Sequence, residues 1–206
     1  MYKAFGGEIN DLHGYKLVRD YGYDERREDY REVFEAKKNG KNYILNVGRC
    51  DHPPQGINLM FEDEVDLSKV MAKLKIGPKI VDVWRTTAVS DTECIVILCM
   101  AMPKWDTTLQ ELKINPKNKL LVKAKLCKLI HSHTGVLSKL HRKLKCAHGD
   151  THKGNVVINL DRQGIPKHAA LIDFECTYRL SNHKKIAKMY PGISGTIEFI
   201  ESDNLY

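Results

Sequence analysis

The chain has 206 residues, of which 42% are hydrophobic and 29% charged, and it carries a formal net charge of +7. This composition is typical of a globular protein that buries its core in one generous domain or two small lobes. The longest apolar stretch, residues 94–102, is much shorter than a membrane span, and the six cysteines lack the paired spacing of a disulfide framework, which favours a reducing compartment such as the cytoplasm.

The excess positive charge comes largely from residues 113–145 and 184–188. A basic surface attracts nucleic acid, nucleotide phosphates or an acidic partner protein, although most basic runs are solvated helix faces. The lysines here lack the interleaved aromatic residues on which single-strand binders stack bases. Nucleic acid is therefore not an expected partner.

The first half of the chain predicts mostly β-structure. Its first twenty residues lack an apolar core, so no signal peptide is expected. Alternating side chains around the turn-forming pair Asn39-Gly40 predict a hairpin whose return strand spans residues 43–47. The further elements expected here are a loop at 51–56, a helix at 59–75 ended by Gly77-Pro78, and strands at 79–84 and 94–100.

The second half predicts helices followed by a hairpin. Residues 102–106 contain a proline and lie where the apolar strand pattern ends. They are expected to connect two lobes. A short helix is expected at 107–112 with Asp106 as its N-cap, and a longer helix at 118–143. A hairpin of residues 156–159 and 170–173 and a basic tail follow. The predicted inner face of the long helix is Leu120, Leu121, Leu126, Leu129, Ile130, Val136, Leu137 and Leu140.

Two aspartates stand in different settings near the end of the chain. Asp150 lies in the polar stretch HGDTHKGN at residues 148–155, and Asp173 ends the apolar run of the stretch LIDFE. Phosphoryl transfer requires a carboxylate near the attacking hydroxyl and oxygen ligands that place Mg²⁺ on the phosphates. Asp150 could orient the nucleophile, while Asn155 and Asp173 supply the oxygen ligands.

This region resembles the catalytic core of the protein-kinase superfamily. His148-Gly149-Asp150 with Asn155 matches the spacing of H-R-D-L-x-x-x-N, and Asp173-Phe174-Glu175 matches D-F-G. Gly149 and Glu175 are the replacements found in the H-G-D and D-F-E variants of aminoglycoside, choline and other atypical kinases. Residues 195–200, GTIEFI, resemble the end of a eukaryotic activation segment, although its A-P-E is missing.

The resemblance implies an α+β, protein-kinase-like two-lobe fold, truncated after the activation segment. Residues 1–206 would form a single kinase-like domain, with an N-lobe at 1–101 that holds a five-stranded sheet and the αC helix, and a reduced C-lobe at 102–206. Glu64 would lie on the αC helix and pair with the lysine of strand three. Cys99 would be the gatekeeper residue beside the nucleotide, and the backbones of Met100 and Met102 would face adenine.

Three departures from the family pattern bear on activity. Asn46 stands where the lysine of V-A-I-K is expected, with Arg49 or Lys37 as candidate replacements. The glycine-rich loop is missing, since Gly22 is followed by the acidic, bulky residues 24–29. The chain ends soon after the activation segment, as in some viral and archaeal atypical kinases, which suggests a large DNA virus as its source.

Several simpler interpretations compete with these roles. Asp150 could cap a turn, His148 could be a structural histidine bonded to backbone, and Glu64 could be an ordinary exposed helix residue. Lys153 could touch phosphate or be solvated. A zinc site at His148 and His152 is disfavoured, because histidines four residues apart share a face only on a helix, and glycines interrupt this stretch.

The expected function is ATP- and Mg²⁺-dependent phosphotransfer of the protein Ser/Thr kinase type, at a low rate. The alternatives are a pseudokinase that acts as a binding module for another kinase or its partner, and a small-molecule kinase of the aminoglycoside or choline kinase type. The expected partners are ATP and a protein substrate or partner kinase, with no membrane, in the cytoplasm or in a host cytoplasm. The expected site residues are Asp150 and Lys153 for catalysis, Glu64, Cys99, Met100, Met102, Asn155 and Asp173 for the nucleotide, and Asn155 and Asp173 for the metal.

Overall fold

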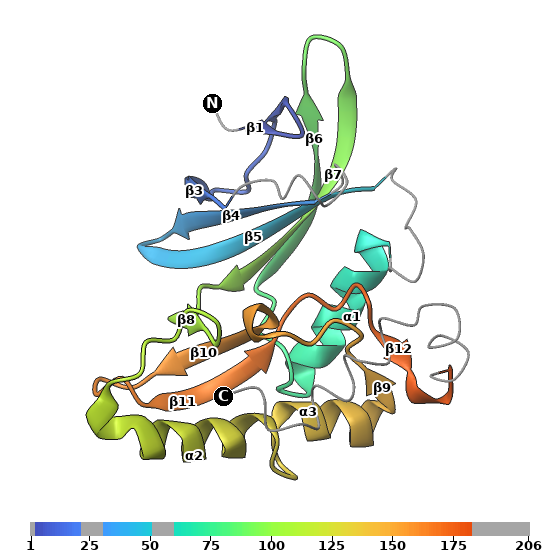
Figure 1. The fold of residues 1–206 in the computed structure, drawn as a ribbon. Helices are drawn as coiled ribbons and strands as arrows, with labels where there is room; N and C mark the ends of the chain where they lie inside the picture. The colour runs from blue at the N-terminus through green and yellow to red at the C-terminus, as the bar shows by residue number, and fades with distance from the viewer. Residues whose placement is uncertain (1–2, 22–30, 51–59, 183–206) are drawn as a thin grey trace. The chain divides into compact units, whose positions relative to one another are not determined.

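The structure is a computed structural model that describes residues 3–21, 31–50 and 60–182 (Figure 1). The chain forms two compact units of an α+β protein. Unit 1 comprises Met1–Lys69 and Lys79–Lys104, and unit 2 comprises Val70–Pro78 and Trp105–Tyr206. The sequence features at residues 22–29, 51–56 and 184–200 lie outside the described residues.

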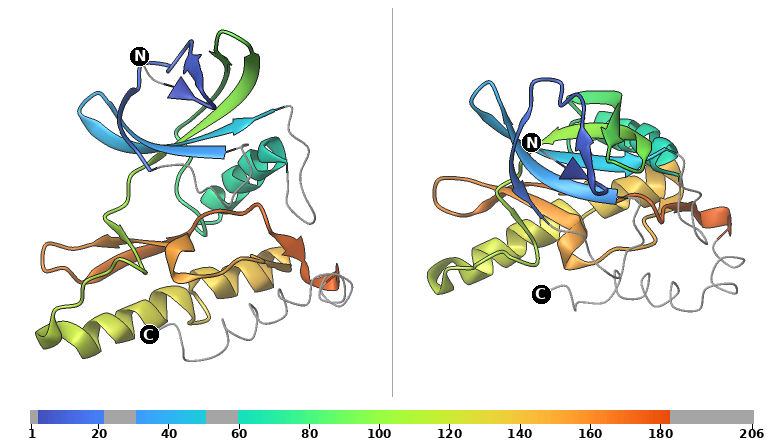
Figure 2. Two further views of the ribbon diagram at one scale, coloured as in Figure 1. Left: turned by 45° about the horizontal axis from the view of Figure 1, so that its top comes forward. Right: turned by 90° about the horizontal axis from the view of Figure 1, so that it is seen from above.

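Unit 1 is built on a seven-stranded antiparallel sheet, which curls into a half-barrel (Figure 2). Five strands were expected, and the edge hairpin of β1 and β2 was missed because its strands are too short to show alternation. The strand order is β1-β2-β6-β7-β5-β4-β3. The strands are β1 (Lys3–Ala4), β2 (Gly7–Ile9), β3 (Lys16–Asp20), β4 (Arg31–Lys38), β5 (Lys41–Arg49), β6 (Asp82–Val89) and β7 (Cys94–Pro103).

The predicted hairpin at Asn39-Gly40 is confirmed. Lys38 pairs with Lys41, and both turn residues have positive φ angles, 50° for Asn39 and 73° for Gly40. A two-residue turn of this kind requires positive φ at both central positions, which asparagine and glycine tolerate. The strand expected at 79–84 is displaced, because β6 begins at Asp82 and continues through β-branched residues to Val89.

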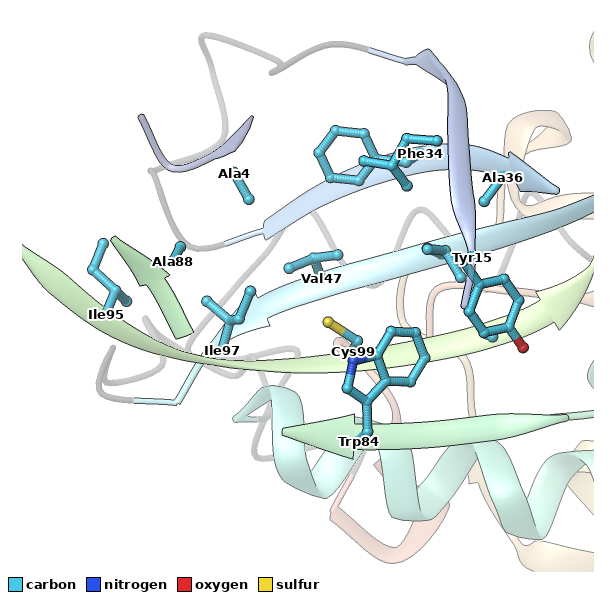
Figure 3. Packing of buried hydrophobic residues seen from close by; sticks show 13 residues of the cluster. Ala4, Tyr15, Phe34, Ala36, Val47, Trp84, Ala88, Ile95, Ile97 and Cys99 are labelled. Carbon is cyan, nitrogen blue, oxygen red and sulfur yellow. The ribbon is translucent and has the colours of Figure 1, made fainter. Parts of the chain in front are cut away.

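Side chains of one face of the sheet form the core of unit 1 (Figure 3). Leu45 and Val47 of β5 and Ile97 and Cys99 of β7 are fully buried there, in keeping with the two-residue period of strands. The ring of Tyr15 stacks on Trp84 at a centroid distance of 5.4 Å, and the Lys38 ammonium lies 4.4 Å from the Tyr15 centroid.

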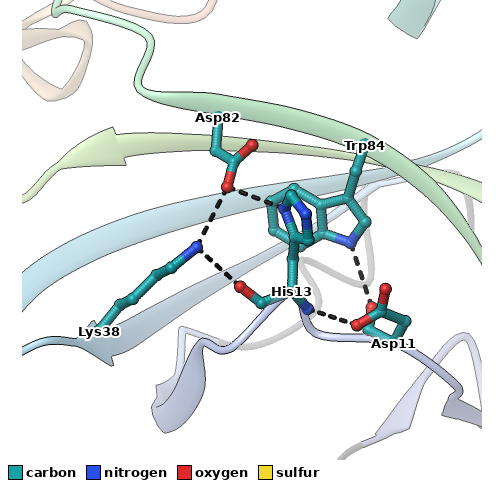
Figure 4. A network of polar contacts seen from close by, with 5 residues as sticks. All are labelled: Asp11, His13, Lys38, Asp82 and Trp84. Atoms are coloured by element: carbon teal, nitrogen blue, oxygen red, sulfur yellow. Dashed lines mark hydrogen bonds and ion pairs between the residues drawn. The ribbon is translucent and has the colours of Figure 1, made fainter.

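A polar network fastens residues 11–13 to β4 and β6 (Figure 4). The Lys38 ammonium donates to the His13 carbonyl at 2.7 Å and to the Asp82 carboxylate at 3.3 Å. His13 Nδ1 lies 2.9 Å from the same carboxylate oxygen, and the Trp84 indole donates to the Asp11 carbonyl at 3.1 Å. Burial and the charge of Asp82 raise the pKa of Tyr15 to about 12, so this phenol stays neutral.

The helix α1 (Phe61–Lys73) is two residues shorter at each end than the range 59–75 predicted from its spacing. Phe61 and Val65 are buried in unit 1, and Met71 is buried in unit 2. The helix ends where Lys75 takes a positive φ of 57° and the backbone N–H groups of Ile76 and Gly77 donate to the Met71 carbonyl. These bonds satisfy a carbonyl at the helix end, so the chain turns before Gly77-Pro78 is reached.

Unit 2 combines short strands with two helices. The expected hairpin is confirmed as β10 (Val156–Leu160) and β11 (Pro166–Leu171), and β8 (Thr107–Thr108) extends it into a sheet of order β11-β10-β8. The helices α2 (Lys119–Ile130) and α3 (Val136–Lys139) pack against β11. The remaining strands, β9 (Cys146–Ala147) and β12 (Tyr178–Arg179), pair with each other.

Two helix predictions for unit 2 are wrong. The range 107–112 contains β8, and Asp106 accepts a hydrogen bond from the Leu160 N–H at 2.7 Å instead of capping a helix. The range 118–143 is interrupted after Ile130, where Gly135 turns so tightly that a side chain there would clash with the Ile130 carbonyl. Among the described residues, no helix is both long and apolar enough to cross a membrane.

Candidate functional site

Within unit 2, hydrogen bonds join the stretch 148–155 to the stretch 172–177. The Ile172 N–H donates to the Asn155 carbonyl at 3.0 Å, and His148 Nε2 lies 2.8 Å from the Ile172 carbonyl. The Thr177 hydroxyl donates to the His148 carbonyl at 3.4 Å. The H-G-D and D-F-E motifs, which are well separated in the sequence, are therefore neighbours in the fold.

Gly149 is required by this junction. Its φ is +84°, and a Cβ at this position would lie closer than 3.0 Å to the backbone carbonyl of Cys176. Only glycine combines the left-handed conformation with the absence of a side chain. The departure from H-R-D thus has a local cause: an arginine does not fit between these two stretches.

His148 is a structural residue, as the simpler interpretation held. It is fully buried, and its ring packs against Phe174 at a centroid distance of 5.2 Å. Burial lowers the pKa of His148, so the ring is neutral. Because the Ile172 carbonyl can only accept, Nε2 carries the proton. Within the described part of the chain, Nδ1 has no hydrogen-bond partner.

The free energy of unfolding should fall as the pH drops from about 7 to about 5. The unfolded chain takes up a proton below the ordinary histidine pKa of about 6.5, whereas the lowered pKa of His148 keeps the folded state unprotonated. This difference destabilises the fold by up to about 1.4 kcal/mol per pH unit. His148→Gln keeps an N–H donor but cannot titrate. In urea unfolding at a series of pH values, the free energy of unfolding of this variant should therefore fall less steeply with decreasing pH than that of the parent protein. Equal slopes for the two proteins would contradict this assignment.

Asp150 is held in place by Asn155. The Asn155 amide donates to the Asp150 carbonyl at 3.0 Å and to its carboxylate at 3.2 Å. Asn155 is buried, while the Asp150 side chain remains 40% exposed. The carboxylate is therefore oriented by the protein and accessible to another molecule. Because the amide N–H₂ of Asn155 faces Asp150, its oxygen is the atom left to coordinate a ligand.

His152 also adjoins Asp150, a role that the sequence analysis missed. The Gly154 N–H donates to His152 Nδ1 at 3.0 Å, which places the proton of the neutral ring on Nε2. Nε2 lies 3.7 Å from the Asp150 carboxylate. A side chain at Gly154 would clash with the His152 ring, since its Cβ would lie 2.7 Å from that ring. A histidine two residues before a glycine was therefore the sequence signal that could have revealed this turn.

Asp173 occupies a strained backbone position. Its φ is 65°, in the left-handed region that non-glycine residues rarely adopt and that aspartate tolerates better than most. Phe174 next to it is buried, and its ring reaches Gly77. The charges of Asp150 and Asp173 both act to raise the pKa of His148, against the larger effect of burial, which lowers it. Strain at such a position is typical of functional sites.

The oxygen atoms of Asp173 and Asn155 in unit 2 suit a magnesium ion that is bound together with phosphates. Asp173 and Asn155 offer the carboxylate and amide oxygens that Mg²⁺ prefers. Among the described residues, no group of three or more histidine, cysteine, aspartate or glutamate side chains is arranged to hold a metal ion. Magnesium is commonly held by one or two protein oxygens together with substrate phosphates, so the set suits a metal that arrives with a nucleotide.

Lys153 follows His152 in a single turn of 3₁₀-helix, Lys153–Asn155. Its carbonyl accepts a hydrogen bond from the Gln110 N–H at 3.1 Å, and its side chain is half-buried. The backbone bond fixes the turn that carries Asn155. The predicted catalytic role of the Lys153 ammonium stays a prediction.

In unit 1, Glu64 pairs with an arginine that the sequence analysis did not single out. The Arg31 guanidinium contacts the Glu64 carboxylate, and both side chains are buried, with exposed fractions of 7% and 2%. The Arg31 guanidinium also lies 5.3 Å from the centroid of the Phe61 ring. Glu64 is therefore not an ordinary exposed helix residue.

The register of the sheet explains why Arg31 takes this position. Arg31 lies opposite Gly48, where a Cβ would clash with Phe61, so α1 packs directly on this face of the sheet. The candidates taken from the sequence lie elsewhere: Arg49 pairs with Glu93 at 3.2 Å, and Lys37 is exposed. Alternation along β4 places Arg31 on the face of the sheet that carries Asn46. This alternation was the sequence signal that could have identified Arg31 as a partner of Glu64.

The same alternation decides which way the side chain of Cys99, the expected gatekeeper, points. Cys99 lies opposite Val47, and its side chain is fully buried in the core cluster of unit 1 (Figure 3). Burial raises the pKa of Cys99 to about 12, so its thiol is inert as well as inaccessible. Met100 lies opposite Asn46, on the face where α1 packs. The side chain of Cys99 therefore lies on the face of the sheet opposite to Asn46, and its expected contact with a nucleotide is not supported.

The backbones of Met100 and Met102 were expected to face adenine. Met100 pairs with Asn46 of β5 and Val83 of β6, so strands lie on both sides of it and its expected contact is not supported. Met102 lies opposite Ile44, just beyond the pair of Asp82 with Ala101, and its role stays a prediction. No protein-family model matches the chain, and no curated protein matches it.

Proposed function

We propose that unit 2 carries an ATP-dependent phosphotransfer site of the protein Ser/Thr kinase type, in a kinase-like fold. The observation that carries the proposal is the pairing of Asp150 with Asn155 beside Asp173. One accessible carboxylate is oriented by a buried amide, and a second carboxylate stands on a strained backbone in the adjoining stretch. This set meets the needs of phosphoryl transfer.

In this proposal each residue has one task. Asp150 accepts a hydrogen bond from the acceptor hydroxyl and orients its oxygen toward the phosphorus, and Asn155 keeps the carboxylate in that orientation. The Asn155 oxygen and the Asp173 carboxylate would hold Mg²⁺, which would neutralise charge on the phosphates. His148 and Gly149 keep the two stretches together and do not touch the reacting groups.

The Arg31–Glu64 pair bears on the missing lysine. Kinases use a lysine–glutamate pair on the phosphates, and here Asn46 stands at the lysine position. Arg31 is the cation that Glu64 holds instead, and its guanidinium can bond two oxygens at once. Within unit 1, Arg31 therefore takes the place of that lysine as the cation paired with Glu64.

Two observations bear on the alternatives, a pseudokinase and a small-molecule kinase. The uncharged Asn46 favours a pseudokinase that binds nucleotide without transferring phosphate. The H-G-D motif no longer favours a small-molecule kinase, because Gly149 is explained by its closeness to Cys176. The pseudokinase is the second candidate.

ATP with Mg²⁺ should raise the midpoint of thermal unfolding. A ligand that binds only the folded state stabilises it by about 2.7 kcal/mol at a hundredfold excess over its dissociation constant. Asp173→Asn should abolish the shift, because asparagine tolerates the positive φ but lacks the charge. The matched control is Glu111→Gln, an exposed acidic residue of the same unit, which should keep the shift. No shift with the unaltered protein at millimolar ATP would overturn the proposal.

Transfer itself is tested by labelling with γ-³²P-ATP and a mixture of basic and acidic protein substrates. Asp150→Asn should lower the initial rate by a factor of about 10² to 10⁴. A thermal shift without any labelling would identify the pseudokinase. Labelling of metabolites alone would identify a small-molecule kinase.

A further inference from the structure

The helix α2 of unit 2 turns an apolar stripe away from its own core. Its buried side, formed by Val122, Leu126 and Ile130, belongs to the face that packs on β11. On the opposite side Leu120, Ala124 and Cys127 are exposed at positions i, i+4 and i+7, and these three residues are called the α2 stripe below. Leu120 is 84% exposed, and its neighbour Leu121 is 50% exposed. Leu120, Ala124 and Cys127 together leave an exposed apolar strip along one side of the helix.

The α2 stripe lies in a strongly basic surface. Helical geometry puts Lys123 on one flank of the stripe and Lys125 and Lys128 on the other. Residues 112–149 contain ten lysines and arginines and no aspartate or glutamate. The basic residues are Lys113, Lys117, Lys119, Lys123, Lys125, Lys128, Lys139, Arg142, Lys143 and Lys145.

We propose that the α2 stripe is the docking site for an amphipathic acidic helix of a partner protein. Apolar anchors at i, i+4 and i+7 flanked by charge are the pattern by which helices pair, and the flanking lysines select glutamate or aspartate on the partner. Ala124 and Cys127 are small enough to let a second helix approach closely. A second copy of this chain is excluded as the occupant, because it would bring lysines against lysines.

Other polyanions fit the surface less well. Helices that lie in a membrane interface carry a continuous apolar side of tryptophan, phenylalanine or leucine, whereas the α2 stripe offers one leucine and two small residues. Single-strand binders use aromatic side chains to stack bases. Residues 112–149 contain no aromatic residue of these types. The larger apolar side of α2 is also occupied by β11 and cannot enter lipid. The inference is independent of the proposed phosphotransfer, since it uses none of the site residues.

The test uses the full chain and a fluorescein-labelled helical peptide of about 21 residues with leucine at heptad positions a and d and glutamate at e and g. Fluorescence anisotropy should detect binding that weakens as salt rises from about 50 to about 500 mM. Leu120→Asp should weaken binding at least about tenfold, since it removes the largest apolar side chain of the α2 stripe and repels glutamate. The double variant Lys125→Glu/Lys128→Glu should do the same and reduce the salt dependence.

The controls separate the surface from the fold. Arg162→Glu alters an exposed cation in the β10–β11 turn and should change affinity less than about twofold. Leu120→Asp should unfold at the same temperature as the parent protein, because its side chain is exposed and an acidic residue suits the first turn of a helix. A peptide with lysine in place of glutamate should not bind.

Three results would overturn the proposal. They are the absence of binding to the acidic peptide, equal binding by the Leu120→Asp variant, and equal binding of the lysine peptide. Vesicles of phosphatidylcholine and phosphatidylserine are tested in parallel. Binding to these vesicles without binding to the acidic peptide would assign the surface to an anionic membrane instead.

Discussion

Gly149→Ala should lower the free energy of unfolding by more than about 3 kcal/mol. Two costs add at this position. A side chain at a φ of +84° is strained by about 1 to 2 kcal/mol, and the added methyl group would overlap the Cys176 carbonyl, which is backbone and cannot rotate away. Relief of the overlap would separate the stretches 148–155 and 172–177 and break the bonds of His148 and Asn155 to Ile172. Urea unfolding followed by circular dichroism measures the loss.

Gly164→Ala is the matched control for this substitution. Gly164 lies in the β10–β11 turn of the same unit with a φ of +76°, but a Cβ there would meet no heavy atom within 4 Å. Only the backbone strain remains, so we expect a loss of about 1 to 2 kcal/mol. Equal losses for the two variants would mean that the contact with Cys176 is unimportant. Because Gly149 lies beside Asp150, Gly149→Ala should also lose the thermal shift with ATP.

Arg31→Met should lower the free energy of unfolding by about 3 to 5 kcal/mol, and Glu64→Leu by a similar amount. Each substitution leaves a charge in a buried setting without its counterion, since both side chains are almost inaccessible to water. The double variant should lose much less, because two apolar side chains of similar size replace the pair and no buried charge is left. A double-mutant cycle on the urea unfolding curves measures the coupling between the two residues.

The ion pair of Lys69 with Asp66 provides the comparison on the same helix. These side chains are 45% and 79% exposed, and their charges lie 2.8 Å apart. Solvent screening reduces such a pair to about 0 to 1 kcal/mol, so Lys69→Ala and Asp66→Ala should be nearly neutral. A small effect of Arg31→Met, comparable to these, would show that the buried pair is hydrated in solution.

The sequence predicted well those local features that depend on a single short segment. The turn at Asn39-Gly40 depends on two residues that accept positive φ angles, and the β10–β11 hairpin depends on two apolar runs with a turn between them. The proximity of Asp150, Asn155 and Asp173 was also expected, although through a resemblance between motifs. Their hydrogen bonds could not be foreseen, because they depend on how two separate stretches meet.

The features that the sequence did not predict depend on which side of an element faces the core. Leu120 and Leu121 fit the apolar period of a helix, yet β11 covers Val122, Leu126 and Ile130 instead. A shift of one residue in β7 moves Cys99 into the core and Met100 to the opposite face. Arg31 was overlooked for the same reason, because its partner is set by strand register.

The edge strands of unit 1 have a consequence for synthesis on the ribosome. Asn10, which follows β2, bonds to Thr87 of β6, 77 residues further along the chain. At about 5 to 20 residues per second, the ribosome needs about 4 to 15 seconds to make that stretch. During this interval Tyr15 has no Trp84 to stack on, and β2 has only β1 to pair with. The nascent N-terminal segment therefore depends on its polar residues, or on a chaperone, to stay soluble until β6 emerges.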